Sequence, residues 1–254
     1  MDARVSADGV NAEDFIQKFS HNLKNPLTAA IGSIDIIREG LLGPINEEQE
    51  EYLQSAIDSC HEVVMMLDNL IDIKKFSAGK IKMSIHRHNA GELINKVAAQ
   101  FARQARHDGI GFSLELESGA AEIAVDSRAF TRVLENLLVN VLKSTQEGDK
   151  ITVSSRSIPG DDLHEMKIPA YAPIPADFPH HGRFVKITVK ASGNGIPADE
   201  LEHVFNCDTT EQERSDTRLG LAYCKLAVES LHGTIWAESE AEEENVFAIL
   251  LPCC

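Results

Sequence analysis

FSHNLKNPL, at residues 19–27, lies near the start of a long segment whose apolar residues recur every three or four positions. This spacing predicts one amphipathic helix over about residues 12–39, with a single buried stripe. His21 lies off that stripe, and Asn25 follows one turn later on the same face, because residues four apart on a helix are neighbours. Pro26 removes a backbone hydrogen bond and is expected to kink the helix just after the pair. For a lone histidine in this position, the ordinary interpretation is a solvated side chain.

The composition is that of an acidic globular protein. Of its 254 residues, 43% are apolar and 25% are charged, and the net charge is −16. This length can hold two modest domains. The acidic balance argues against nucleic-acid binding, for which a basic face is expected. Because no apolar run is long enough to cross a membrane and the first residues lack a signal-peptide pattern, the sequence predicts a cytoplasmic chain with no membrane segment.

The cysteines and one histidine pair are the candidate residues for a metal or disulfide site. The five cysteines have no CxxC spacing, which disfavours both a disulfide framework and a zinc site. They are Cys60, Cys207, Cys224, Cys253 and Cys254. His180 and His181 are adjacent, but no acid or cysteine stands at ligand spacing, so solvated loop histidines are expected.

A second helix is predicted from residue 46 to about residue 76. Asn46 fits the N-cap position, and the acidic residues that follow it favour the positive end of a helix. Residues 13–79 are therefore expected to form a helical hairpin after a polar, flexible lead-in at residues 1–12. Because two such helices cannot bury both stripes against each other, a homodimer with a four-helix bundle is expected. The alternative is a hairpin that packs on the rest of its own chain.

From about residue 81 the pattern changes to short strands that alternate with helices, which is typical of an α/β sandwich with one sheet covered by helices. Strands are expected at 83–86, 111–117, 122–125, 151–155, 184–189, 234–238 and 246–250. Helices are expected at 90–108, 127–145, 198–205 and 219–231. A proline-rich insert at 158–182 is long for an ordered connection, so it is either a functional insert or a mobile loop. The predicted fold class is α+β, a helical hairpin followed by an α/β sandwich.

Several motifs resemble those of two-component sensor histidine kinases. Residues 19–27 resemble the phospho-accepting histidine box, and residues 81–252 resemble the catalytic ATP-binding domain of the same family. The second resemblance is carried by ENLLVNVLK at 135–143, VKASGNGIP at 189–197, TRLGLA at 217–222 and GTIWAESE at 233–240. Together the two resemblances cover nearly the whole chain. They imply a dimeric signalling protein that uses ATP and Mg²⁺ and acts with a response-regulator receiver domain.

The resemblance also implies roles for particular residues. It implies that His21 accepts the phosphoryl group, that Lys24 offsets phosphate charge, and that Asn25 orients a water for dephosphorylating a partner's phospho-aspartate. In the ATP-binding domain it implies that Asn140 binds Mg²⁺ and that Asn136 and Lys143 face the nucleotide. The other nucleotide-site positions implied in this way are Ala191, Gly193, Gly195, Arg218 and Gly220.

Three departures from the family pattern weaken the expected nucleotide site. Ala191 replaces the aspartate that accepts the adenine amino group, a loss of about 1–3 kcal/mol of nucleotide affinity. Ser215, Asp216 and Arg218 replace glycines that let a backbone approach phosphates, although Arg218 offers a charge that can reach a phosphate. The segment 205–218 is also short and lacks the second phenylalanine of the family's ATP lid.

The histidine box differs from the family pattern at one position. Asn22 replaces the usual acidic residue that acts as general base, and an amide cannot accept a proton at neutral pH. The chain is therefore expected to exchange, relay or remove phosphoryl groups through His21, with ATP-dependent autokinase activity weak or lost. ATP and Mg²⁺ are then cofactors only if the nucleotide site still works. Two alternatives stay open, an active sensor histidine kinase that autophosphorylates on His21, and a non-enzymatic pseudokinase scaffold in which His21 is incidental.

Overall fold

The computed structural model describes residues 5–117, 121–172, 174–175, 178–179, 182–193, 195–206, 216–240 and 244–254, with side chains from residue 18 onward except at 216, 217 and 240. The chain divides into two compact units. They are the helical unit, residues 1–81, and the α/β unit, residues 82–254.

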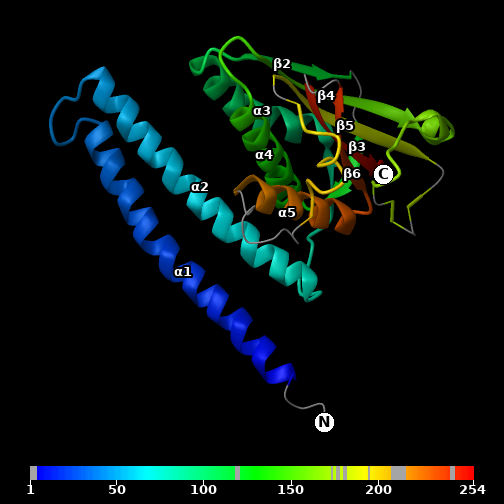
Figure 1. Ribbon diagram of the computed structural model, residues 1–254, viewed down its shortest axis with the longest axis horizontal. Helices are drawn as coiled ribbons and strands as arrows, with labels where there is room; N and C mark the ends of the chain where they lie inside the picture. Colours follow the sequence, from blue (N-terminus) through cyan, green and yellow to red (C-terminus); the bar gives the residue numbers. More distant parts are fainter. Residues whose placement is uncertain are drawn as a thin grey trace. The chain divides into compact units, whose positions relative to one another are not determined.

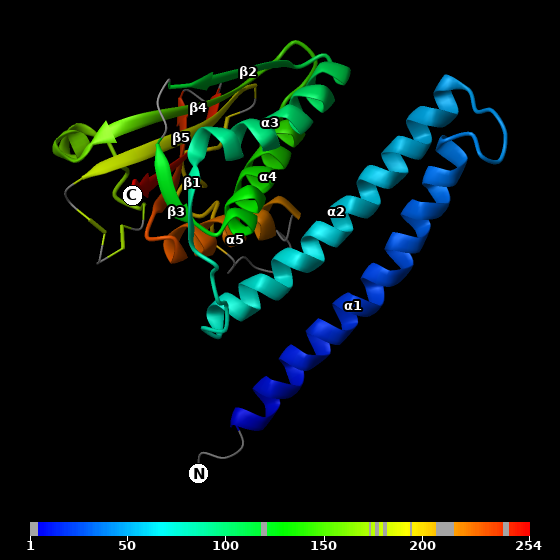
Figure 2. The same cartoon turned by 180° about the vertical axis from the view of Figure 1, so that it is seen from behind.

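The helical unit is an antiparallel hairpin of α1 (Val5–Arg38) and α2 (Glu47–Ser77), which lie side by side in Figures 1 and 2. Asn46 caps α2 as predicted, because its side chain accepts from the Gln49 N–H while the Gln49 side chain accepts from the Asn46 N–H. The prediction of a flexible lead-in was wrong for residues 5–12, which are helical. Once a helix has formed, each added residue gains a hydrogen bond, so α1 extends toward its N-terminus at little cost.

Two polar contacts fix the register of the hairpin. Lys24 of α1 forms an ion pair with Asp68 of α2, and Arg38 donates a hydrogen bond to Gln54 nearer the connecting loop. Both contacts fit one antiparallel register. His21 precedes Lys24 by three residues, so it lies at the level of α2 three residues beyond Asp68, near Ile71.

The α/β unit is built on a five-stranded mixed sheet in the order β2–β4–β5–β7–β6. The strands are β2 (Gly111–Leu116), β4 (Lys150–Pro159), β5 (Arg183–Ser192), β6 (Thr234–Glu240) and β7 (Glu244–Pro252). Only β2 and β4 pair in parallel. A separate two-stranded sheet joins β1 (His86–Asn89) to β3 (Glu122–Val125).

Three helices cover one face of the larger sheet, as Figures 1 and 2 show. They are α3 (Ala90–His107), α4 (Ser127–Ser144) and α5 (Asp216–Ser230). The core between helices and sheet takes fully buried apolar side chains from α4 and from alternate positions of β5. These are Phe130, Val133, Leu134, Leu137, Leu138, Val141, Val185, Ile187 and Val189. The predicted α/β sandwich is confirmed.

Two predicted elements are corrected. The first strand lies at 86–89 rather than 83–86. The helix expected over 198–205 is a succession of turns, in which the N–H groups of Glu200, His203 and Asn206 each donate to the carbonyl three residues earlier. A segment of this length after a proline forms too few hydrogen bonds to offset the entropy cost of nucleating an α-helix, so tighter turns form instead.

The proline-rich insert packs on the sheet face opposite the helices. After the short 3₁₀ helix η1 (Gly160–Glu165), Phe178 stacks on Phe184 of β5 with ring centroids 5.2 Å apart. The Tyr171 hydroxyl donates to the Ala237 carbonyl at 2.6 Å. Burial, together with the charges of Glu238 and Glu202, raises the pKa of Tyr171, so the hydroxyl keeps the proton that it donates. The described part of the insert therefore packs against the sheet.

The Asp126 side chain makes hydrogen bonds both with the start of α4 and with the segment before β1. Its carboxylate accepts from the N–H groups of Arg128 and Ala129 at 3.0 and 3.1 Å, which caps α4, and from the Ser84 N–H at 2.8 Å. Burial by itself raises the pKa of Asp126, but these hydrogen bonds and the charge of Arg128 together lower it below 3.8.

Replacing Asp126 by alanine is expected to lower the free energy of unfolding of the α/β unit by about 1 kcal/mol, because a capping acceptor is lost. The ionic part of this contribution is fully present above the ordinary pKa of 3.8 and is lost as the pH falls through the lower folded-state pKa. Urea unfolding followed by fluorescence of Trp236, the single tryptophan, measures both effects. Asp126→Asn keeps the acceptor and is the control; equal stability of the parent and Asp126→Ala at pH 7 would contradict the assignment.

Candidate functional site

The helical unit presents one polar face on α1 around His21. The side chains of His21, Asn22 and Asn25 are all exposed. Pro26 lies inside α1 and leaves the Asn22 carbonyl without the usual helical donor. His21 and Asn25 are one turn apart, so the imidazole and the amide share a surface that a partner domain can reach.

The two neighbours of this face have other roles. Lys24 is half-buried, and its ammonium group forms an ion pair with Asp68 of α2. Ser20 is only 1% exposed, which places it on the inner side of α1, away from His21. The chemistry available on the outer face is therefore that of an accessible imidazole nucleophile with an amide beside it.

In the α/β unit, the first asparagine of the predicted nucleotide site lies inside a helix contact. Asn136 is 4% exposed, and its Nδ2 donates to the Arg132 carbonyl at 3.0 Å. A Cβ added at Gly220 of α5 would lie 2.7 Å from the Asn136 Oδ1, so Gly220 permits α5 to pack closely on α4. Asn140 is half-buried one turn later, and Lys143 is exposed. Among the three, Asn140 and Lys143 have surface that a ligand can reach.

The glycine turn after β5 packs on the turn between α4 and β4. Gly193 has φ of +114°, a conformation that favours glycine, and a Cβ there would lie 2.8 Å from the Asp149 carboxylate. Ser192 donates to the same carboxylate at 3.1 Å and accepts from the Lys150 N–H at 2.8 Å. Gly195 is half-buried. Sequence reasoning missed Asp149, which belongs to no motif that it used, and gave no role to Ser192, which lies within VKASGNGIP.

Ala191, at the end of β5, has no exposed surface and faces the helices. Its cross-strand partner is Asn245 of β7, which is 5% exposed. A carboxamide therefore lies beside the position where the resemblance implies a carboxylate. The sequence does hold a signal for Asn245, which is a polar residue at an inward position of an otherwise apolar closing strand.

Arg218, at the start of α5, is half-buried and pairs with Glu200, with 3.4 Å between Nη2 and Oε2. Its guanidinium is thus held near a carboxylate. The substitutions at Ser215 and Asp216, the thiol of Cys207, and the pair His180 and His181 lie outside the described side chains.

The described thiols and ligand groups form no metal site. Cys60, Cys224, Cys253 and Cys254 are free, and burial raises the pKa of Cys224, so that thiol stays protonated. Within the described residues, no three histidine, cysteine or carboxylate side chains are grouped to hold an ion.

These residues fit an adenine nucleotide with Mg²⁺ poorly. They offer little for binding the adenine base and one amide ligand for Mg²⁺. Ala191 supplies no acceptor and no open surface, and the Asn136 amide is engaged within the α4–α5 contact. Asn140 supplies one amide oxygen that can reach a metal, which is the ligand type Mg²⁺ takes.

Two family models match this chain. The model of the His Kinase A (phospho-acceptor) domain matches residues 11–79, and that of the histidine kinase-, DNA gyrase B- and HSP90-like ATPase matches residues 125–253. The first match contains His21, and the second contains the asparagine and glycine motifs of the α/β unit.

Curated relatives match along nearly the full chain. An uncharacterized sensor-like histidine kinase of Rhizobium meliloti is 26% identical over 99% of this chain and 46% of that protein. The histidine protein kinase DivJ of Caulobacter vibrioides is 24% identical over 98% of this chain and 39% of that protein. The chain thus spans less than half the length of these two relatives.

Solved structures match as well. Full-length ShkA, crystallised with AMPPNP, has a TM-score of 0.65 at 18% identity, over 95% of this chain and 46% of that one. The catalytic domain of the histidine kinase ThkA has a TM-score of 0.53 at 26% identity, over 67% of this chain and 97% of that one. Within the described part of the chain, no helix has the length and apolar character needed to cross a bilayer.

Proposed function

We propose a function from the premise that this chain belongs to the two-component histidine kinases. It exchanges or removes phosphoryl groups on a response-regulator receiver domain through His21, and phosphorylates itself from ATP weakly or not at all. The observation that carries this proposal is the exposed His21 on α1 with exposed Asn25 one turn away.

The proposed transfer starts from a receiver with a phosphorylated aspartate. An imidazole nitrogen of His21 attacks phosphorus, the aspartate carboxylate leaves with the bonding electrons, and the ring loses its extra proton to solvent. The reverse step returns the phosphoryl group to a carboxylate. In the competing hydrolysis, a water held by Asn25 attacks phosphorus, and the products are inorganic phosphate and the free aspartate.

The low autokinase activity is proposed from the α/β unit and from α1. Supporting it are the buried Ala191, the engaged amide of Asn136 and the pairing of Arg218 with Glu200. Asn22 adds to this, because an amide beside His21 cannot take the proton as ATP is attacked.

Asn25→Ala is expected to slow dephosphorylation of a phosphorylated receiver by about tenfold while label still reaches His21, because only the water-holding amide is lost. Asn22→Ala is the matched control, since it removes the same group from the neighbouring exposed position. Timed quenching with radiolabelled receiver separates label on the receiver, on His21 and as free phosphate. Equal rates for both variants and the parent would remove Asn25 from the proposal.

A second candidate is an ATP-dependent autokinase. It is favoured by the match to an ATPase family model and by the AMPPNP bound to full-length ShkA, which shares this fold. Calorimetric titration with Mg-ATP distinguishes the two, because binding at micromolar concentration supports the autokinase and no binding at about 1 mM eliminates it.

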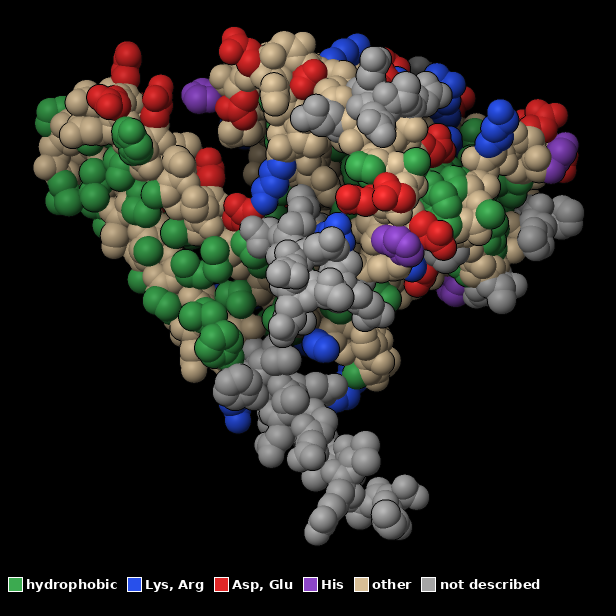
Figure 3. All heavy atoms as spheres, viewed as in Figure 1, with side chains coloured by type: hydrophobic (Ala, Val, Ile, Leu, Met, Phe, Trp, Pro, Cys, Tyr) green, Lys and Arg blue, Asp and Glu red, His purple; other side chains and the backbone are tan. Residues whose placement is uncertain are grey.

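We also propose that the helical unit dimerises. Large apolar side chains are exposed on α1, α2 and the connecting loop, and Figure 3 shows such side chains gathered over the hairpin. They are Phe19, Ile36, Ile37, Leu41, Leu42, Tyr52 and Val63. A second copy would cover this stripe in a four-helix bundle. Sedimentation equilibrium should give the mass of two chains; a single-chain mass at about 100 μM contradicts dimerisation.

A further inference from the structure

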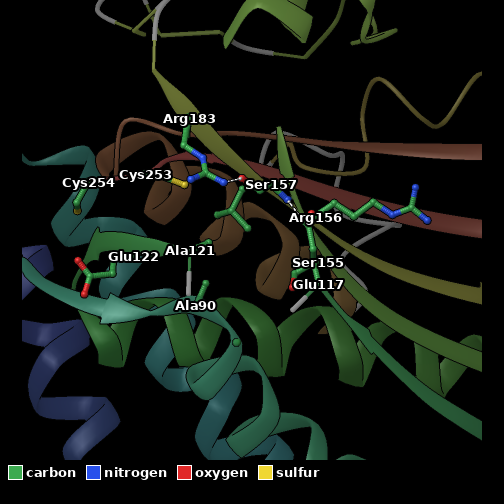
Figure 4. A pocket seen from close by; sticks show the side chains of 12 residues that line it. Ala90, Glu117, Ala121, Glu122, Ser155, Arg156, Ser157, Arg183, Cys253 and Cys254 are labelled. Carbon is green, nitrogen blue, oxygen red and sulfur yellow. Dashed lines mark hydrogen bonds between the residues drawn. The ribbon is translucent and has the colours of Figure 1, made fainter. Parts of the chain in front are cut away.

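A pocket of about 310 Å³ lies in the α/β unit at the end of the sheet away from Ala191. Its walls come from the start of α3, the later part of β4, the start of β5 and the C-terminal segment (Figure 4). The volume is at the lower end of the range for small-molecule sites. None of the residues assigned above to phosphoryl transfer or to the nucleotide lines it.

The first feature of the pocket is the N-terminus of α3, which has 18 residues. The Ala90 N–H donates to the Ala121 carbonyl at 3.0 Å, and the Glu92 N–H donates to the Asn89 side chain. Gly91 lines the pocket, and its N–H donates to no group in the described part of the chain. Since glycine has no side chain to shield this N–H, the positive end of the helix is open to a ligand.

The second feature is an independent polar group in the same pocket. Ser155 of β4 is 7% exposed and lines the pocket, on the strand face shared with Ile151 and Val153. Its hydroxyl makes no hydrogen bond with any described residue. Because Ser155 borders the pocket, a ligand or water there can complete the hydrogen bonds of its hydroxyl.

The third feature is a cation, the exposed Arg183. The Arg183 guanidinium points toward Ser157, donating to its hydroxyl at 3.2 Å, and makes no ion pair with a described carboxylate (Figure 4). Two acids, Glu117 and Glu122, also line the pocket; Glu117 accepts from the Ser157 N–H, and Glu122 lies 4.0 Å from Arg87. Apart from its bond to Ser157, the Arg183 guanidinium makes no hydrogen bond with a described residue, so it can still donate to an anion.

We propose that this pocket binds a small oxyanion-bearing ligand, a carboxylate or a phosphate, held by the Gly91 N–H, the Ser155 hydroxyl and the Arg183 guanidinium. A helix N-terminus, a hydroxyl and an arginine fork together match the charge and the acceptor geometry of such groups. The site is separate from the proposed phosphoryl transfer, so neither depends on the other.

Titration of the whole chain with sodium phosphate and with sodium acetate, each against sodium chloride at equal ionic strength, tests the site. The readouts are the calorimetric dissociation constant and the shift in Tm of the Trp236 transition, which rises with ligand concentration. The parent should bind at least one of the two oxyanions more tightly than chloride. A response to phosphate alone, or to acetate alone, identifies which carrier of the oxyanion fits.

Arg183→Gln, Ser155→Ala and Gly91→Ala should each weaken binding at least about tenfold. The methyl group of Gly91→Ala would lie 3.2 Å from Asn89 Oδ1 and cover the N–H, while alanine is tolerated in a helix. Arg156→Gln is the matched control, because this arginine extends away from the other lining side chains in Figure 4, and its binding should equal that of the parent. No preference over chloride, or equal losses in Arg156→Gln and Arg183→Gln, would overturn the proposal.

Discussion

His21→Ala is expected to abolish transfer of the phosphoryl group from a phosphorylated receiver to this chain, with a loss of at least about 10³-fold in rate. The imidazole is the nucleophile of the proposed step. Asn22 and Asn25 have amide side chains, which do not attack phosphorus, and the Lys24 ammonium group forms an ion pair with Asp68. The measurement is acid-labile label on the chain after mixing with radiolabelled receiver.

His61→Ala provides the matched control. His61 is an exposed imidazole on α2 in the same unit, so its loss tests whether any surface histidine takes the label. Because His21 is exposed, its replacement is expected to leave the hairpin folded, which circular dichroism checks. Transfer that persists in His21→Ala and disappears in His61→Ala would contradict the assignment of the acceptor.

Ala191→Asp is expected to raise the affinity for Mg-ATP by about 10- to 100-fold, the inverse of the loss expected from one missing buried acceptor. The new carboxylate would lie beside Asn245, its cross-strand neighbour, at the inner end of β5. Because Ala191 has no exposed surface, adding a carboxylate there is also expected to lower the free energy of unfolding when ATP is absent. Calorimetric titration and urea unfolding measure the two effects.

Ala191→Leu is the control for the second prediction. Leucine fills similar space without an acceptor, so it should leave ATP affinity as weak as in the parent. If the parent already binds Mg-ATP at micromolar concentration, and Ala191→Asp changes that affinity less than about twofold, the acceptor argument is wrong.

The helical elements could be predicted because their signals are local. The apolar spacing after FSHNLKNPL sets α1, and Asn46 with Gln49 forms a capping box within four residues. Likewise, alternation and helical spacing placed α3, α4, β2 and β3 to within one or two residues. The short segment 198–205 was assigned wrongly because a few apolar positions at helical spacing do not overcome the cost of nucleation.

The details of the α/β unit depend on contacts between distant segments, which one sequence does not display. Asp149 meets the glycine turn 44 residues later only because β4 and β5 pair as they do. Asn245 reaches Ala191 for the same reason, through the pairing of β5 with β7. The prolines of the insert predict a loop. In the structure, Tyr171 hydrogen-bonds to the sheet and Phe178 stacks on it.

The sequence motifs and the structure together leave His21 accessible on α1 and place a buried alanine, Ala191, at the end of β5 where the family pattern has an aspartate. In the proposed function, phosphoryl groups reach His21 from a receiver rather than from ATP. The most direct measurement follows label on His21 in two parallel reactions, one with radiolabelled phospho-receiver and one with Mg-ATP labelled at the γ-phosphate. We expect rapid labelling from the receiver and little or none from ATP; faster labelling from ATP than from the receiver would contradict the proposed route.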